Sequence, residues 1–316
     1  PEAITLFKAQ FGPSAQKAQE ATLETCRALI AQSRMGETLL NFAHTAGIQI
    51  VEGDQIQSVL YDRSNGIIRL RKNLNLVEKS MLMVREMRRL FQQKQGALIN
   101  PLLFHPDHAV LVNRLQAADL MTHMVRVAWE IKLSGNPAPW AYLESNGYND
   151  LTRVMAREAM ADFRSLNNGR AMAATFEAWF ISERCRAFDR TLIQQMLADY
   201  QSYVQSAGHV ETSRILSHQM ISALGTMTYG NNYLSAHASI ILSDPIFTEI
   251  RDRSNANFLW FIKFEQSFRQ TERDLQHKDG STGKLSDTEK NRHGKDTATI
   301  LHLSTARAHG DDHPKA

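Results

Sequence analysis

The sequence lacks most features that mark secreted, membrane and nucleotide-binding proteins. It holds only two cysteines, Cys26 and Cys185, in 316 residues. This excludes a disulfide-stapled fold and a four-thiolate zinc site, and it fits a reducing, cytoplasmic compartment. No apolar run approaches the eighteen residues that a membrane span needs. Neither a Gly-rich phosphate loop nor a Gly-x-Ser-x-Gly elbow occurs, so the sequence supports no kinase, nucleotide-binding or serine hydrolase function.

The chain also lacks a large excess of charge of either sign, so its net charge does not indicate a nucleic-acid partner. The 36 Lys and Arg residues are nearly balanced by 33 Asp and Glu residues, for a formal net charge of +3. Hydrophobic residues make up 43% of the chain, which is enough for a well-packed core. No linker divides residues 15–270, so we expect one soluble domain over 1–270. From residue 271 large apolar side chains nearly vanish, which predicts a disordered polar tail over 271–316.

The hydrophobic pattern predicts an α+β fold that is mostly helical. Alternating apolar residues at 48–52 and 56–61, and an Asn65-Gly66 turn before 67–71, indicate a small N-terminal antiparallel sheet between Ile48 and Arg71. Helical spacing before the sheet begins near Gly12. The helices expected after the sheet cover residues 75–95, 108–133, 150–166, 169–205, 209–226 and 255–270.

The helix over residues 75–95 follows a hairpin, which is where a minimal zinc-peptidase core carries its active helix. Asn75 and Glu78 form a capping box at its start. A zinc peptidase would show the pattern HExxH, in which two histidines hold Zn²⁺ and the Glu is the general base. This chain has Arg-Glu-Met-Arg-Arg at residues 85–89. The Glu is present, but a guanidinium has no lone pair for a metal.

At this point the chain resembles a bacterial family described as putative metallopeptidases, whose core is zincin-like. Three segments carry the resemblance, at residues 85–92 (REMRRLFQ), 114–119 (RLQAAD) and 176–180 (FEAWF). The first is similar to the HELRHxxQ stretch of the family, and the second to a helix that reads Glu-Ala-Asp-Ala and supplies an acidic third ligand. The resemblance covers roughly residues 40 to 200, and it implies a zincin-like active-helix arrangement.

Carried over position by position, the resemblance implies a degenerate site. The two histidine positions fall on Arg85 and Arg89, the acidic third ligand falls on Ala117, and the general-base position is kept as Glu86. Two guanidinium groups place positive charge where a dication would bind, so we expect no metal and no other cofactor. The resulting hypothesis is a non-hydrolytic pseudo-peptidase, in which Arg89 pairs with Glu86 and the remaining charge receives an anionic group.

Three other interpretations remain open. An active peptidase could use a rearranged zinc set of Glu86, Asp119 and His123, because the last two are spaced i and i+4 on one helix. The protein could instead be a helical interaction module, with the arginines on a solvated helix face. Residues 62–94 carry nine basic and three acidic residues, which favours an acidic peptide or protein as partner. Nucleic acid is not the expected partner, because exposed aromatic residues for base stacking are missing there.

Overall fold

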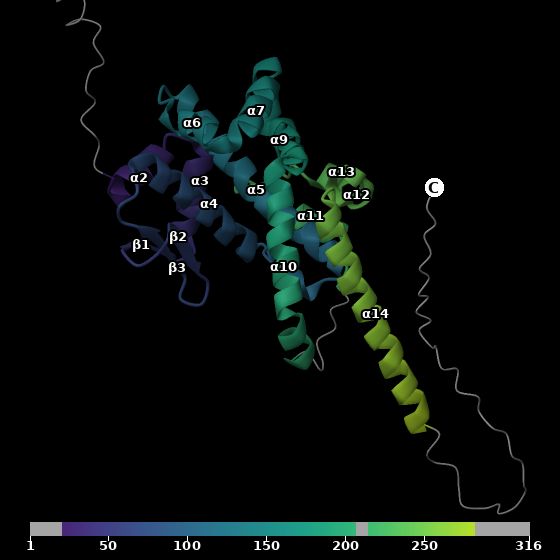
Figure 1. Cartoon of the computed structure of the whole chain (residues 1–316). Coiled ribbons are helices and arrows are strands. Elements are labelled where there is room, and N and C mark those ends of the chain that lie inside the picture. The colour runs from purple at the N-terminus through teal and green to yellow at the C-terminus, as the bar shows by residue number, and fades with distance from the viewer. Residues whose placement is uncertain (1–20, 207–213, 282–316) are drawn as a thin grey trace, which may run out of the picture. The chain divides into compact units, whose positions relative to one another are not determined.

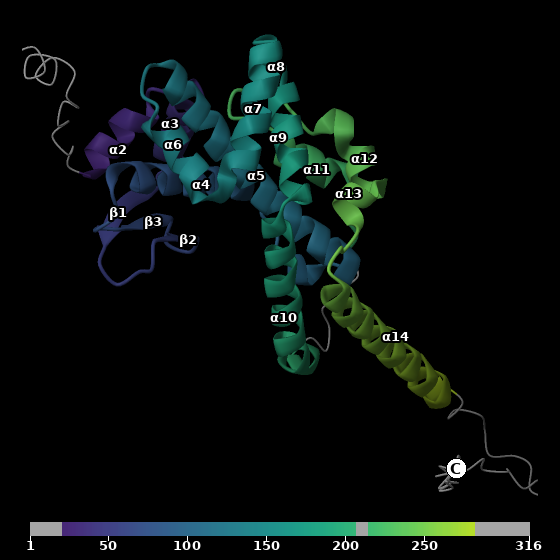
Figure 2. The same ribbon diagram turned by 45° about the horizontal axis from the view of Figure 1, so that its top comes forward.

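Helix α5 (Pro106–Leu133) is the axis of the fold in this computed structural model, which describes residues 21–206 and 214–281. Side chains are buried along most of its length, because other helices pack on it, namely α3 (Arg34–Thr45), α4 (Leu76–Lys94), α6 (Ala138–Leu143), α7 (Asn149–Ala161), α9 (Arg170–Ile181) and α11 (His218–Gly225). Figures 1 and 2 show α5 running through the middle of these helices, with the strands beside α4. The predicted mostly helical α+β class is confirmed.

The elements before α5 are α2 (Leu23–Ile30), α3 (Arg34–Thr45), β1 (Gln49–Gly53), β2 (Val59–Asp62), β3 (Ile67–Arg71) and α4 (Leu76–Lys94), with a 3₁₀ turn at Pro101–Leu103. After α5 come α6 (Ala138–Leu143), α7 (Asn149–Ala161), α8 (Arg164–Asn168), α9 (Arg170–Ile181) and α10 (Glu183–Ser206). The described chain ends with α11 (His218–Gly225), α12 (Ala238–Ser243), α13 (Pro245–Thr248) and α14 (Arg253–Ser281).

The small sheet is mixed, so the prediction of an antiparallel sheet was wrong for one of its two pairings. Strand β3 is central: β2 pairs with it antiparallel through the predicted hairpin, whereas β1 pairs with it in parallel. The physical reason lies in β3, whose Ile68 and Leu70 are fully buried against α4. The most buried strand takes the centre of the sheet, and residues 54–58 carry the chain from one edge to the other.

Several helix boundaries differ from the prediction. The predicted helix over 169–205 is divided at Ser182, whose backbone is extended, and the one over 150–166 is divided at Asp162. The predicted helix over 209–226 is α-helical only from His218, and residues 209–213 lie outside the described part of the chain. The predicted start of the N-terminal helix near Gly12 also lies outside it. Helix α14 continues to Ser281, beyond the predicted end at residue 270.

The chain divides into two units, residues 1–267 and 268–316. The predicted division at 270 stays a prediction, and most of the predicted tail, residues 282–316, lies outside the described residues. Among the described helices, none is both long and apolar enough to cross a lipid bilayer.

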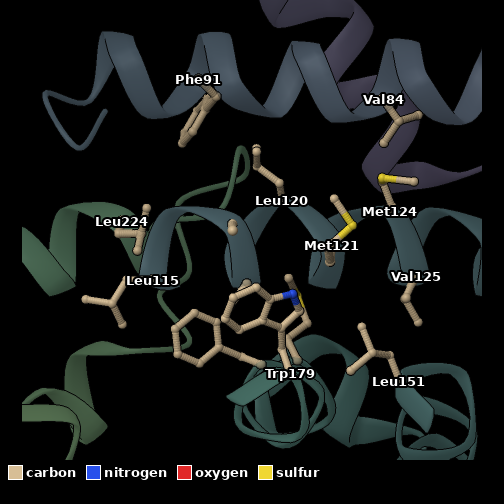
Figure 3. Close-up of a cluster of buried hydrophobic side chains, with 14 of the residues drawn as sticks. Val84, Phe91, Leu115, Leu120, Met121, Met124, Val125, Leu151, Trp179 and Leu224 are labelled. Atoms are coloured by element: carbon tan, nitrogen blue, oxygen red, sulfur yellow. The ribbon is translucent and has the colours of Figure 1, made fainter. Parts of the chain in front are cut away.

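The core of the first unit forms where α4 and α9 pack on opposite sides of α5. Figure 3 shows Val84 and Phe91 of α4 pointing toward Leu120 and Met124 of α5, with Trp179 of α9 on the other side. All are at most 4% exposed. Burial of each such side chain stabilises the fold by about 1.5–3 kcal/mol, and it fixes which face of α4 points away from the core.

Candidate functional site

The site is built on α4, whose start follows the sequence prediction in part. Asn75 caps the helix by accepting a hydrogen bond from the backbone N–H of Glu78, at 2.9 Å. The Glu78 carboxylate contacts the side-chain amide of Asn75 at 3.4 Å instead of its backbone N–H, so only half of the predicted capping box forms. The apolar run at residues 81–84 is buried as predicted, except for Leu82, which is partly exposed.

Glu86 lies in the middle of α4, enclosed by the two arginines that stand at the predicted ligand positions. Its side chain is 0% exposed, and those of Arg85 and Arg89 are 25% and 33% exposed. Nε of Arg85 donates to Oε1 of Glu86 at 2.9 Å, and a terminal nitrogen of Arg89 donates to Oε2 at 2.7 Å. Each carboxylate oxygen therefore accepts a charge-assisted hydrogen bond. The predicted pairing of Glu86 with Arg89 is present.

The surroundings of this trio add positive charge. Burial lowers the pKa of Arg89, Glu86 raises it, and the nearby guanidinium groups of Arg85 and Arg63 lower it again. Arg63 is exposed in the β2–β3 turn, so the sheet brings a third cation to α4. On the other flank, burial raises the pKa of Tyr142 in α6, and Arg85 acts in the opposite direction. Arg85, Arg89 and Arg63 thus set three positive charges around the carboxylate of Glu86, and Glu78 adds a negative charge on the side of Tyr142, whose pKa it raises.

The third predicted ligand position offers no metal donor. Ala117 lies on α5 and is 6% exposed, and its methyl group has no lone pair. The guanidinium groups of Arg85 and Arg89 have no lone pair either. Among the four positions that the resemblance assigns to the site, only Glu86 has a side-chain oxygen that could bind a metal. These residues do not fit a zinc ion.

Asp119, a member of the alternative metal set, is the acceptor of a buried polar network. Arg88 binds it in a bidentate pair, from Nε to Oδ2 at 2.7 Å and from a terminal nitrogen to Oδ1 at 2.9 Å. Gln92 donates to Oδ2 and the Tyr233 hydroxyl donates to Oδ1, both at 2.6 Å. Burial alone would raise the pKa of Asp119, but Arg88 and His123 hold it well below its usual range. Asp119 is thus committed to protein donors.

His123 lies one turn along α5 and is fully buried. Its Nδ1 is 2.9 Å from the backbone oxygen of Asp119 and 3.2 Å from Oδ1. Its Nε2 is buried and has no hydrogen-bond partner among the described residues. Burial lowers the pKa of His123, and Arg88 acts in the same direction. Asp119 and His123 are therefore together, as their spacing predicts.

Glu86 does not join that pair in a metal-binding group. Within residues 21–206 and 214–281, no cluster of three or more His, Cys, Asp or Glu side chains is arranged to hold a metal ion. The described partners of Glu86 are Arg85 and Arg89, whereas Asp119 faces Arg88. Glu86 and Asp119 thus belong to separate ion pairs.

Arg88, which the sequence pattern did not single out, joins α4 to α5 and α11. Its side chain is 0% exposed, and besides Asp119 it donates to the backbone oxygens of Leu224 and Thr226, at 2.7 and 2.9 Å. A solvated helix face was one interpretation of this arginine, and that interpretation is wrong for Arg88. A signal was available: it lies one turn from Val84, on the stripe that the core buries, and a buried arginine requires an acceptor.

A second buried ion pair joins the segment at residues 114–119 to α10. Arg114 of α5 forms a bidentate pair with Asp189 of α10, at 2.7 and 2.6 Å, and it also donates to the backbone oxygens of Phe247 and Glu249. Cys185 lines the pocket beside this pair, and burial raises its pKa to about 11, so the thiol is not a nucleophile at neutral pH.

Comparisons with known proteins give one match. No curated protein and no solved structure matches the chain. A family model described as "Putative metallopeptidase family" matches residues 4–235, which include the α4 site and all three segments of the resemblance. The chain therefore belongs to this metallopeptidase-like family.

Proposed function

We propose that this chain is a pseudo-peptidase, a member of its family that does not hydrolyse peptides and uses its former active helix to bind an acidic peptide or protein. One observation carries the proposal: Glu86 is buried between Arg85 and Arg89, and each of its carboxylate oxygens accepts a guanidinium hydrogen bond. The zincin-like ancestry of the site is part of this proposal.

The same geometry argues against hydrolysis. A general base must direct a free carboxylate oxygen at the water that it activates. Both oxygens of Glu86 are engaged, and the groups that engage them repel a dication instead of binding it. We therefore expect the chain to hold no catalytic zinc at α4 and to need no other cofactor there.

The charge left over at the site indicates what it binds. A guanidinium carries five N–H donors, and among the described residues Arg85 and Arg89 each spend one of them, on Glu86. The donors that remain belong to partly exposed side chains, and Arg63 lies near them. Carboxylates are the groups that such donors bind in pairs, so acidic side chains of a peptide suit this surface.

We also propose a cytoplasmic location. Cys26 and Cys185 are both free and buried, and each thiol has a pKa raised by burial. Two thiols that stay reduced suit the cytoplasm better than an oxidising compartment.

Metal content tests the pseudo-peptidase proposal. The full chain and its Glu86→Gln variant are purified, and zinc is measured by plasma mass spectrometry alongside cleavage of a quenched fluorescent peptide library. We expect equal zinc content in the two proteins and no cleavage by either, because the ligand positions at α4 have no metal donors. Residues 271–316 contain histidines that could bind zinc weakly. Any zinc bound there is present in both proteins and does not affect the comparison.

The opposite result is equally clear. About one zinc per chain that is lost in Glu86→Gln but kept in Glu183→Gln, whose side chain is 81% exposed, would overturn the proposal, particularly if peptide cleavage is lost with it. The chain would then be an active peptidase, and Asp119 and His123 would be the first residues to test as ligands.

Binding of an acidic peptide tests the partner class. The Arg63→Gln substitution removes one cation from the site and leaves both ion pairs of Glu86 intact. We expect it to weaken binding of a fluorescein-labelled oligoglutamate by about threefold to tenfold at low salt, with a shallower salt dependence, measured by fluorescence anisotropy.

The matched control is Arg157→Gln, because the Arg157 side chain is 69% exposed and pairs with its neighbour Glu158 in α7. It should bind the peptide like the wild type. If both substitutions weaken peptide binding equally, the affinity depends only on the net charge of the protein. That result would contradict the proposal that the α4 site is the binding surface.

A further inference from the structure

The three-stranded sheet packs on helices through one face, and its other face carries side chains that the proposed function does not use. Residues that pair directly across two strands point to the same face of the sheet. The register therefore separates an inner face, where the buried Ile68 and Leu70 of β3 lie against α4, from an outer face. The positions on this outer face are Gln49, Val51, Gly53, Leu60, Asp62, Ile67, Arg69 and Arg71.

The outer face is open in the described part of the chain. None of its residues is buried, and Leu60 is 50% exposed. The described helices that pack on the strands are α4 and α2. Both lie on the inner side, because Lys79 of α4 donates to Glu52, which pairs with Leu70, and to the backbone oxygen of Ala21 before α2. Figures 1 and 2 show the strands at the margin of the helices, with α4 on one side of them.

Arginine side chains occupy the centre of the outer face. Arg69 and Arg71 belong to β3, the middle strand. Arg69 has no hydrogen-bond or ion-pair partner among the described residues, and Arg71 donates once, to the backbone oxygen of Gln57. The acid on this face is Asp62, and both of its oxygens accept hydrogen bonds from the β2–β3 turn. The donors of Arg69 therefore remain for an anionic partner.

The two ends of the hairpin add further positive charge. Arg63 follows β2 and is exposed, and its guanidinium lowers the pKa of Arg89, so it stands between the outer face and the α4 site. Lys72 follows β3 at the opposite end and is exposed as well. The face and its two ends hold four bases and two acids, namely Arg63, Arg69, Arg71, Lys72, Asp54 and Asp62. An acidic ligand complements this surface.

The neighbours of Arg69 favour a peptide over a nucleic acid. Leu60 and Val51 lie directly opposite Arg69 on the two flanking strands, and Ile67 is the next outer-face residue of β3. None of the outer-face positions is aromatic, so the surface has no ring on which a base could stack. Apolar side chains around a guanidinium suit the aliphatic stems and the carboxylates of acidic side chains.

We propose that the outer face of the sheet is a second contact surface for the acidic peptide that binds at α4, and that the peptide passes from one surface to the other around β2. This inference rests on the proposed function, because it extends the same ligand. Strand β2 is the edge between the two surfaces: Tyr61 donates to Gln93 of α4 on the inner side, whereas Leu60 faces outward. Contact at both surfaces raises affinity, because the second contact forms at a high effective concentration.

Two oligoglutamates of different length test this proposal by fluorescence anisotropy at low salt. A labelled tetrapeptide spans at most about 14 Å and covers one surface, whereas a 16-residue peptide spans about 55 Å and covers both. We expect Arg69→Gln to weaken binding of the 16-residue peptide by about threefold to tenfold and to leave the tetrapeptide unaffected. Arg69→Lys keeps the charge and should bind both peptides like the wild type. Urea unfolding of each variant verifies that the fold is retained.

The matched control is again Arg157→Gln, which removes the same charge from α7 and should leave the binding of both peptides unchanged. The proposal is overturned if Arg69→Gln binds the 16-residue peptide as tightly as the wild type does. It is also overturned if a 16-nucleotide oligothymidylate binds more tightly than the peptide and is the ligand that Arg69→Gln weakens, because the face would then belong to a nucleic acid.

Failure of the α4 site gives a different result. If Arg63→Gln leaves the tetrapeptide unaffected while Arg69→Gln still weakens the 16-residue peptide, the outer face is the whole binding surface. That outcome overturns the shared path around β2 together with the proposed role of α4.

Discussion

At the scale of single residues, the polar groups that matter most are buried ones whose partners lie far away in sequence. Asp119 accepts hydrogen bonds from Arg88, Gln92 and Tyr233 while it is itself 0% exposed. Burying an isolated carboxylate costs a large desolvation free energy. The arginine and the carboxylate are therefore stable in the core only as a pair. The same carboxylate raises the pKa of Tyr233, in addition to the larger effect of burial.

His123 gives the fold a dependence on pH. Burial and then Arg88 lower its pKa, so the folded protein keeps this imidazole neutral at pH values where an unfolded histidine, with a pKa of about 6.5, takes up a proton. The unfolded state therefore binds more protons below pH 6.5. We expect the free energy of unfolding to be fully retained above that pH and to fall, as pH is lowered, by at most about 1.4 kcal/mol per pH unit.

Urea unfolding between pH 7 and pH 4.5 measures this slope, and a His123→Gln variant should show a shallower one. Some slope will remain, because burial also lowers the pKa of His108. His237→Gln is the control, since His237 is exposed. Equal slopes in the wild type and His123→Gln would show that His123 does not link folding to pH. Asp119 acts in a separate window: its lowered pKa stabilises the fold above about pH 3.9 and ceases to do so in stronger acid.

At the scale of elements, Arg88 joins α4 to α5 through Asp119, and to the C-terminal end of α11 through the backbone oxygens of Leu224 and Thr226. Asp119→Asn keeps the shape of the side chain but leaves the Arg88 guanidinium buried without its counter-charge. We expect this substitution to lower the free energy of unfolding by about 3–5 kcal/mol at pH 7, measured by urea denaturation.

Asp150→Asn is the comparison for that experiment. Asp150 also pairs with an arginine, Arg184, but its side chain is 40% exposed, so its loss should cost at most about 1 kcal/mol. If the two substitutions cost the same, the Arg88–Asp119 pair is no more than an ordinary surface ion pair, and α4 is held by its apolar face alone.

The elements also show which signals in the sequence were sufficient. Helix α4 agrees with its prediction to within a residue at each end, because its Asn75 cap and the helical spacing of its apolar residues are local features. The antiparallel arrangement of the sheet was predicted wrongly for β1, because alternation defines a strand and not the direction of its partner. The division at Ser182 has no Gly or Pro to mark it.

At the scale of the whole molecule, two surfaces have related roles. The α4 site is small and cationic, and its proposed partner is an acidic chain. The outer face of the sheet combines arginines with apolar side chains, and its proposed ligand is the continuation of that chain. The two are separable by experiment, because Arg63→Gln should weaken binding of short and long peptides alike, whereas Arg69→Gln leaves both ion pairs of Glu86 intact and should weaken binding of the long peptide alone.

The sequence by itself determined the helical class, the α4 helix and the presence of Arg85, Arg89 and Ala117, whose side chains have no lone pair for a metal, because each follows from residue type and local spacing. Tertiary structure decided where the charges go. Arg88 and Arg89 are neighbours with the same chemistry, yet one is buried on Asp119 and the other caps Glu86 at the surface. The 100° step between them puts one on the core side of α4, and the position of the core depends on contacts that local sequence does not specify.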